Sequence, residues 1–465
     1  LAGRTLFVGA NDGMLHAFDA YTGRERFAYV PNLVFDNLRR LGSSDYHEHP
    51  RYYVDAAPTV GQVLESSRRR RTYLVGGLGR GGRGYYCLLL SSVEQEQAML
   101  RASGIQNEVS VDRYVTGASE EVVSRLVQWE YPAVDIADDA MDNDGDGIVD
   151  ESGENDPHLG YSFSQAYAVN ANAPAGYHRP VVIFGNGYGS PGGQAVLYVL
   201  EACSGRILRK INTGAGGRNG LSTPALIDVD LDRRIDYAYA GDLKGNLWKF
   251  DLTAPDPERW GIASPTGAGS RPQPLFQATG LSITGRPDVM AVNPVCTPDA
   301  SGVMVIFGTG AHPGYDPVRT RPNAIFSVWD NGRTDPVASW SVELSSISVT
   351  PGHSEERITG AVAIRGGRAV VTAYIPGTFP GPAHGNGSRI YVLDACTGTP
   401  VGNADGTADY PMTLYGGISS NPVILKNPSQ PYTDHFLAWD SAGRIVQSAF
   451  SGERQGRVYW RQNFE

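Results

Sequence analysis

Short apolar runs recur along the chain, each ending near a glycine and followed by a turn and a second apolar run. Runs of this length between glycine-rich turns predict β-strands. Several paired runs end on an acidic residue and a Thr-Gly or Ser-Gly turn, as at Asp19 to Gly23. The pattern defines seven units, which begin at Leu6, Tyr73, Val182, Tyr237, Val305, Val371 and Phe436.

A further strand-like segment precedes most of these units and often carries a proline near its start. Proline is tolerated at the first position of a strand, where its missing N–H costs least. The prolines in question are Pro58, Pro224, Pro287 and Pro422. With this extra strand, each unit has the length of a four-stranded meander, and the units repeat at roughly 55 to 70 residues.

A single twisted meander cannot bury both of its faces, whereas radial stacking against two neighbours does so and protects the strand edges. The 57 glycines and 30 prolines also suit many short strands joined by tight turns. We therefore predict an all-β chain in which residues 1–465 form a single domain, a seven-bladed β-propeller.

One insertion interrupts the repeat between the second and third units, from about residue 91 to residue 160. Apolar positions within Glu120–Trp129 predict a short helix there. The rest of the insertion is expected to be an acidic loop. At the other end of the chain, Arg457–Gln462 is expected to form a last outer strand.

The formal charge of −10 is concentrated in the insertion, where ten Asp or Glu residues and no Lys or Arg lie between Asp135 and Asp156. Outside that stretch, acidic and basic residues are equal in number. Nucleic acid is not an expected partner, because phosphate binding needs a basic face. No membrane-spanning segment is predicted, because the chain has no run of 18 apolar residues.

The first candidate metal site is the stretch from Asp142 to Asp150 inside the insertion. Oxygens at positions 1, 3 and 5 of such a loop surround a hard cation, position 7 offers its carbonyl and position 9 closes the shell. Gly147 occupies position 6, where the sharp turn requires glycine. We predict a Ca²⁺ site whose ligands are Asp142, Asp144, Asp146, Ile148 through its carbonyl, and Asp150.

A second loop between two predicted strands has the same spacing. Its predicted Ca²⁺ ligands are Asp228, Asp230, Asp232, Arg234 through its carbonyl, and Asp236. Four carboxylates this close together repel one another, which favours a bound cation. Arg233 departs from the pattern at position 6. The alternative is an ordinary turn in which the aspartates accept hydrogen bonds from backbone N–H groups.

The sequence contains no recognisable set of catalytic residues. Gly77 to Gly82 matches G-x-G-x-x-G, but a strand follows where dinucleotide binding needs a helix. The nucleophile, zinc-protease and P-loop motifs are absent. We therefore expect no enzymatic activity.

Four cysteines stand far apart without a C-x-x-C pair, and the sequence leaves their pairing open.

Several segments resemble known propellers. Ala17 to Phe27 is similar to the A-x-D-x-x-T-G-x-x-x-W docking repeat of quinoprotein propellers, with Phe27 in place of tryptophan. Together with LFVGANDGMLHAFDA, GGLGRGGRGYY, VIFGNGYGS, VIFGTGAH and DVDLDRRIDYAYAGDLKGNLWKFDL, it makes the chain resemble the C-terminal propeller of the PilC/PilY family.

That resemblance implies a modified, quinoprotein-like propeller in an exported protein, found at the cell surface with type IV pili or in the outer membrane or periplasm in transit. It implies support of pilus biogenesis and twitching motility, Ca²⁺-dependent control of pilus extension against retraction, and adhesion linked to virulence. The implied partners are pilins or minor pilins and a host or abiotic surface. The family's Ca²⁺ loop maps onto the residues from Asp228 to Asp236.

Two other classes of protein remain open from the sequence. A PQQ-type quinoprotein dehydrogenase shares the fold and the use of Ca²⁺, but its quinone is commonly held by adjacent cysteines, which this chain lacks. A periplasmic scaffold could bind partners through the propeller face without a metal.

Overall fold

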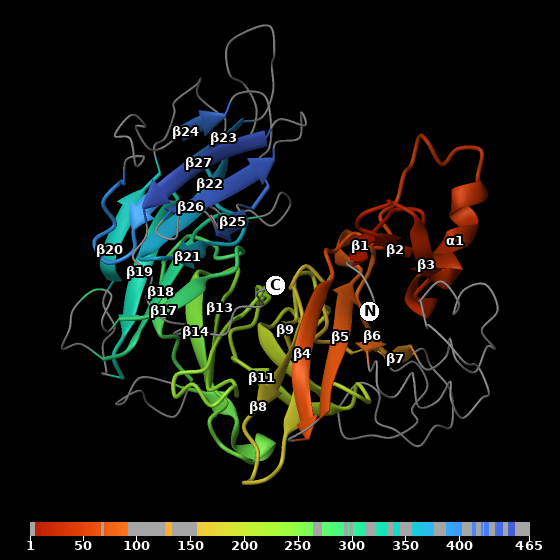
Figure 1. The fold of residues 1–465 in the computed structure, drawn as a ribbon, viewed down its shortest axis with the longest axis horizontal. Helices are drawn as coiled ribbons and strands as arrows, with labels where there is room; N and C mark the ends of the chain where they lie inside the picture. The colour runs from red at the N-terminus through yellow and green to blue at the C-terminus, as the bar shows by residue number, and fades with distance from the viewer. Residues whose placement is uncertain are drawn as a thin grey trace, which may run out of the picture. The chain divides into compact units, whose positions relative to one another are not determined.

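Antiparallel pairing of short strands organises the computed structural model of the chain (Figure 1). The structure describes residues 5–66, 69–91, 126–132, 156–263, 272–292, 296, 301–311, 322–332, 338–344, 356–375, 387–401, 412–414, 420–421, 423–426, 433–439 and 445–451. Strands within these ranges form seven sheets in chain order. The prediction of an all-β chain is confirmed.

The described residues belong to two compact units, each of which has its own sheets. The first comprises residues 1–221 and 252–260 and contains three sheets. Sheet one has β1 (Thr5–Gly9), β2 (Leu15–Asp19) and β3 (Glu25–Tyr29), followed by η1 (Asn32–Val34), α1 (Phe35–Leu38) and η2 (Arg39–Gly42). Sheet two has β4 (Thr59–Ser66), β5 (Arg69–Gly77), β6 (Tyr85–Ser91) and β7 (Val127–Tyr131), with η3 (Gly79–Gly81) after β5. Sheet three has β8 (Tyr167–Ala171), β9 (Arg179–Gly185), β10 (Val196–Glu201) and β11 (Ile207–Asn212); η4 (Pro257–Arg259) also lies in this unit.

The second unit comprises residues 222–251 and 261–465 and contains the other four sheets. Sheet four has β12 (Ala225–Ile227), β13 (Tyr237–Gly241), β14 (Asn246–Asp251) and β15 (Gly261–Ile262), and β16 (Phe276–Gln277) also pairs with β14. Sheet five has β17 (Asp288–Ala291), β18 (Val303–Gly308), β19 (Ala324–Asp330) and β20 (Ala338–Glu343). Sheet six has β21 (Ala363–Arg365), β22 (Arg368–Ile375), β23 (Gly387–Asp394) and β24 (Met412–Leu414). Sheet seven has β25 (Val423–Lys426), β26 (Thr433–Trp439) and β27 (Ile445–Ser451).

Each predicted unit coincides with one sheet. The seven predicted starting residues lie one each in β1, β5, β9, β13, β18, β22 and β26. In sheets two to seven the preceding strand is the predicted extra one, and it pairs with the strand that follows it. Closure of the sheets into one ring, and a single domain over residues 1–465, stay predictions.

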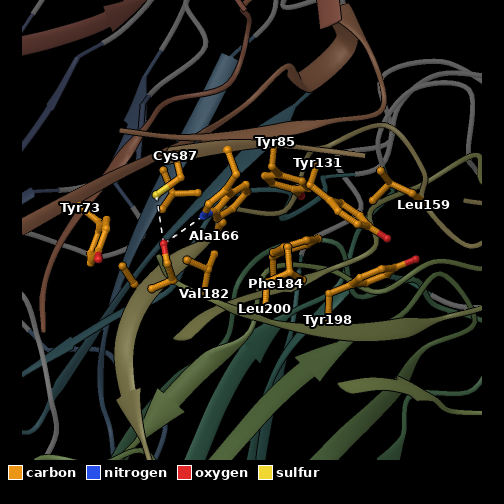
Figure 2. Packing of buried hydrophobic residues seen from close by; sticks show 14 of the residues in the cluster. Tyr73, Tyr85, Cys87, Tyr131, Leu159, Ala166, Val182, Phe184, Tyr198 and Leu200 are labelled. Atoms are coloured by element: carbon orange, nitrogen blue, oxygen red, sulfur yellow. Dashed lines mark hydrogen bonds between the residues drawn. The ribbon is translucent and has the colours of Figure 1, made fainter. Parts of the chain in front are cut away.

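Buried side chains between neighbouring sheets form the core of each unit. In the first unit, one cluster joins sheets two and three, where the rings of Phe184 and Tyr198 stack at 5.2 Å and Tyr85 packs on Phe184 at 4.0 Å (Figure 2). In the second unit, comparable clusters join sheet four to sheet five and sheet five to sheet six. Stacking of sheet upon sheet is therefore what buries the apolar faces within each unit.

Glycine at the end of the second strand allows this close stacking. A Cβ added to Gly241 would lie 2.1 Å from Ile283 Cγ2, and one added to Gly308 would lie 2.4 Å from Ile358 Cγ2. Atoms cannot approach so closely, so a side chain at either position would push the next segment away. The recurrent glycine that marks the repeat in the sequence is thus a packing requirement.

The insertion contains a strand that the sequence analysis missed. The helix predicted over Glu120–Trp129 is wrong where the structure describes it, because Val127–Tyr131 forms β7 and pairs with β6, with Cys87 opposite Trp129. Closely spaced apolar residues fit either element over so short a run. The open edge of β6 decides in favour of a strand, because it supplies hydrogen-bond partners. Residues 120–125 and the predicted strand Arg457–Gln462 lie outside the described residues.

A disulfide joins Cys296 to Cys396 within the second unit, across 100 residues of sequence. Cys87 is free and buried, and Cys203 is free and exposed. None of the helices in the described ranges is long and apolar enough to cross a membrane.

Candidate metal centre

The loop from Asp228 to Asp236 joins the first two strands of sheet four. Ile227 at the end of β12 pairs with Tyr237 at the start of β13, and the Asp236 N–H donates to the Ile227 carbonyl at 2.9 Å. The strand ladder therefore fixes both ends of the loop. The prediction that it connects two strands of one repeat unit is confirmed.

Three of the predicted ligands come together in this loop. Asp228, Asp230 and Asp236 each offer a carboxylate oxygen, and these oxygens lie within 4.8 Å of one another. Asp228 and Asp236 are buried, with 3% and 5% of their surfaces exposed, whereas Asp230 is exposed. Such a set of hard oxygens suits Ca²⁺ or another hard cation.

The fourth predicted carboxylate, Asp232, lies outside this group of three. The Asp232 carboxylate accepts a hydrogen bond from the Arg234 N–H at 2.8 Å, and its second oxygen lies 3.7 Å from Arg234 Nε. Asp232 is exposed. The loop therefore gathers three carboxylates and leaves the fourth paired with the arginine whose carbonyl was predicted to bind the cation.

Backbone N–H groups hold the carboxylates in place. Asp228 Oδ2 accepts from the Arg233 N–H at 2.7 Å, and Asp236 Oδ2 accepts from the Val229 N–H at 2.8 Å. Leu231 and Arg233 both adopt left-handed backbone geometry, with φ of 64° and 73°. This geometry costs a residue with a side chain about 1–2 kcal/mol. Arg233 thus takes the conformation for which the calcium-loop pattern prefers glycine.

Asp228 is the residue of this group whose surroundings best suit a bound cation. Its Oδ1 atom is buried and has no hydrogen-bond partner within the described part of the structure. Burial raises the pKa of Asp228 to about 6, and the nearby charges of Asp236 and Asp232 act in the same direction. A buried carboxylate oxygen without a partner is costly, and a cation bound to it would remove that cost.

The other predicted Ca²⁺ loop lies outside the described residues. Its ligands Asp142, Asp144, Asp146, Ile148 and Asp150 therefore remain sequence predictions.

A cavity of about 380 Å³ next to the Asp228 loop was not anticipated from the sequence. Its walls include Val229 from the loop, Tyr237 and Lys249 from sheet four, and Asp330 at the end of β19. The Lys249 ammonium lies 2.7 Å from Asp330 Oδ2. No local motif connects Lys249 with Asp330, because the two residues are on different sheets.

Known proteins match most of this chain. The family model of the PilY1 β-propeller domain matches residues 2–119 and 123–348, well over half of the sequence. The chain belongs to the PilY1 β-propeller family. The resemblance to PilC/PilY proteins read from the sequence is thereby confirmed.

Curated PilY1 relatives match at similar identity. A type IV pilus biogenesis factor PilY1 homolog of Xylella fastidiosa is 31% identical over 449 residues, which cover 85% of this chain and 26% of that protein. The type IV pilus biogenesis factor PilY1 of Pseudomonas aeruginosa is 30% identical over 345 residues, which cover 70% of this chain and 25% of that protein. The chain thus spans about a quarter of the length of these relatives.

A solved PilY1 structure has the same fold. The crystal structure of the Pseudomonas aeruginosa PilY1 C-terminal domain matches 97% of this chain with a TM-score of 0.63 and 21% sequence identity, and 93% of that domain is covered. At this identity the match supports the propeller fold alone.

Proposed function

We propose that this chain is a Ca²⁺-binding propeller of a type IV pilus biogenesis factor, in which Ca²⁺ at the Asp228 loop controls pilus extension against retraction and promotes surface attachment. Family membership and the names of the curated relatives support the link to pilus biogenesis. The observation that carries the metal proposal is the buried Oδ1 of Asp228, which has no hydrogen-bond partner among the described residues and lies beside two further carboxylates.

Ca²⁺ takes six to eight oxygen ligands. Asp228, Asp230 and Asp236 would supply the first of these. Asp232 and the Arg234 carbonyl would join if the exposed part of the loop shifts as the ion binds. The Asp142 loop would hold a second ion through its own residues.

The proposed location is outside the cytoplasm, at the cell surface with the pilus or in the periplasm and outer membrane in transit. The disulfide between Cys296 and Cys396 supports export, because disulfides persist in oxidising compartments. The proposed partners are pilins or minor pilins, together with a host or abiotic surface.

Calcium titration of the purified protein tests the metal proposal. The wild-type protein should bind two ions, and Asp228→Asn should bind one, because the change removes a carboxylate from the group of three. At a free Ca²⁺ concentration one hundred times the Kd, binding at the Asp228 site should stabilise the wild-type fold by about 2.7 kcal/mol, and this increment should vanish in the variant.

Asp36→Asn provides the matched control, because Asp36 is an exposed aspartate in α1 of the first unit. It should bind as the wild type does. If Asp228→Asn keeps both ions, the Asp228 loop is not a calcium site. The same substitutions in the full-length gene, scored for surface pili and twitching, test the pilus role.

Two alternatives make different predictions in the same assays. A quinoprotein dehydrogenase would reduce a dye in the presence of pyrroloquinoline quinone, Ca²⁺ and an alcohol or sugar, whereas the proposed factor would not. A metal-independent scaffold would show no heat of calcium binding at either loop.

A further inference from the structure

The cavity beside the Asp228 loop has a polar end built around Asp330. Asp330 Oδ2 accepts hydrogen bonds from the Tyr239 hydroxyl at 2.6 Å and from the Lys249 ammonium at 2.7 Å. Asp330 Oδ1 accepts from the Gly332 N–H at 3.3 Å. The carboxylate is 6% exposed. A buried charge satisfied in this way is a fixed feature of the cavity.

Lys249 has hydrogen-bonding capacity left over. Its ammonium lies 4.1 Å from the centre of the Tyr237 ring, and its hydrogen-bond acceptor among the described residues is Asp330. A lysine ammonium has three N–H donors, and a ring face satisfies one of them only weakly. The Lys249 side chain is 14% exposed and lines the cavity. A ligand that enters the cavity with an oxygen acceptor would therefore find a donor.

Aliphatic side chains line another part of the cavity, and the neighbouring loop adds two exposed aliphatic residues. Ile227, Val303 and Ala291 contribute aliphatic walls. Val229 lines the cavity and is 46% exposed, and Leu231, two residues further along the loop, is 59% exposed. These two exposed aliphatic side chains offer contact surface to an apolar group that enters the cavity.

Val229 is tied to the candidate metal centre. Its N–H donates to Asp236 Oδ2, a carboxylate of the group of three. The same loop carries Val229 and gathers the carboxylates. A cation that orders the carboxylates therefore also positions the rim of the cavity, by which we mean Val229 and the nearby Leu231.

We propose that this cavity and its rim form a docking site for an extended segment of a partner protein, which inserts one apolar side chain and offers a backbone carbonyl to Lys249. Calcium in the Asp228 loop positions the rim, so that docking is strengthened by Ca²⁺. This second statement rests on the proposed function, whereas the first does not.

The chemistry favours a peptide over a sugar. Sugars stack on open aromatic faces, but the Lys249 ammonium already covers one face of the Tyr237 ring. The rim is aliphatic, which suits an aliphatic or aromatic side chain. The volume of about 380 Å³ is enough for one large side chain and lies at the lower end of the range for ligand pockets.

Ligand-observed saturation-transfer NMR with the purified chain tests the site. The probe is N-acetyl-L-leucine amide, which carries an aliphatic side chain and two carbonyl acceptors. N-acetylglycine amide, which lacks the side chain, and methyl α-D-glucopyranoside serve as comparison ligands. The leucine probe should bind, and the other two should not.

Two variants connect binding to the cavity. Ala291→Leu should reduce affinity for the leucine probe by about tenfold by filling space, and Lys249→Met should do the same by removing the donor. Val423→Ser is the matched control, because Val423 is 44% exposed on β25 and does not line the cavity. Thermal denaturation identifies any variant that fails to fold, and Ala291→Leu keeps the test decisive if Lys249→Met unfolds.

Calcium dependence is tested by repeating the titration after chelation and in Asp228→Asn. Both should weaken probe binding several-fold. Unchanged binding, in a protein that demonstrably binds Ca²⁺, would overturn the coupling.

Three results would overturn the docking site and leave the calcium proposal standing. They are failure of the leucine probe to bind the calcium-loaded protein, equal binding by Ala291→Leu, and preferential binding of the glucoside. A protein that binds the probe but no Ca²⁺ would overturn the metal proposal and the coupling, and would support the docking site.

Discussion

His16 on β2 lies between two carboxylates. Its Nδ1 is 2.5 Å from Glu25 Oε1 and its Nε2 is 2.8 Å from Asp12 Oδ2. The hydrogen bond to Glu25, followed by the interactions with Asp12, raises the pKa of His16 above its usual value. At the residue scale, the imidazole therefore ties the β1–β2 turn to β3, most strongly in its protonated form.

The sign of the resulting pH dependence follows from the raised pKa. The folded state holds the proton more tightly than the unfolded state, so the stabilisation is complete below the unfolded pKa of about 6.5 and is lost as pH rises through the folded value. The difference in stability between wild type and His16→Gln should therefore shrink from pH 5 to pH 9. Chemical denaturation across that range measures it, and a difference that grows with pH would contradict the assignment.

At the scale of the element, the ends of the second strands determine how sheets stack. Gly241→Ala should destabilise the second unit by about 1–3 kcal/mol, because its Cβ would overlap Ile283. Gly261→Ala is the matched control, because no atom lies within 4 Å of an added Cβ there. Denaturant unfolding compares the two. Equal stability of both variants would show that the close approach at Gly241 is not required.

At the scale of the molecule, the two compact units differ in how they are cross-linked. The second contains the Cys296–Cys396 disulfide, and the two free cysteines belong to the first. Both disulfide cysteines pack against the core cluster between sheets five and six. A bridge across 100 residues removes much conformational freedom from the unfolded chain.

Cys396→Ser should therefore lower the stability of the second unit by about 2–5 kcal/mol. Hydrogen exchange should show faster exchange in sheets four to seven and little change in sheets one to three. Cys203→Ser, which removes an exposed free thiol, should leave both units unchanged. Equal loss of protection in the first three sheets would show that the two units unfold together.

The sequence alone determined most of the strands and their grouping, because both depend largely on local information. Apolar periodicity and recurrent glycines located the repeat that became seven sheets, and aspartate spacing located the Asp228 loop. Tertiary structure decided what depends on partners distant in the sequence. The edge of β6 made a strand of Val127–Tyr131 where periodicity also allowed a helix. Loop geometry drew Asp228, Asp230 and Asp236 together and left Asp232 with Arg234, and the packing of sheet five on sheet four brought Asp330 to Lys249. No spacing rule predicts the Lys249–Asp330 pair or the β6–β7 pairing, because each forms only when separately folded segments meet.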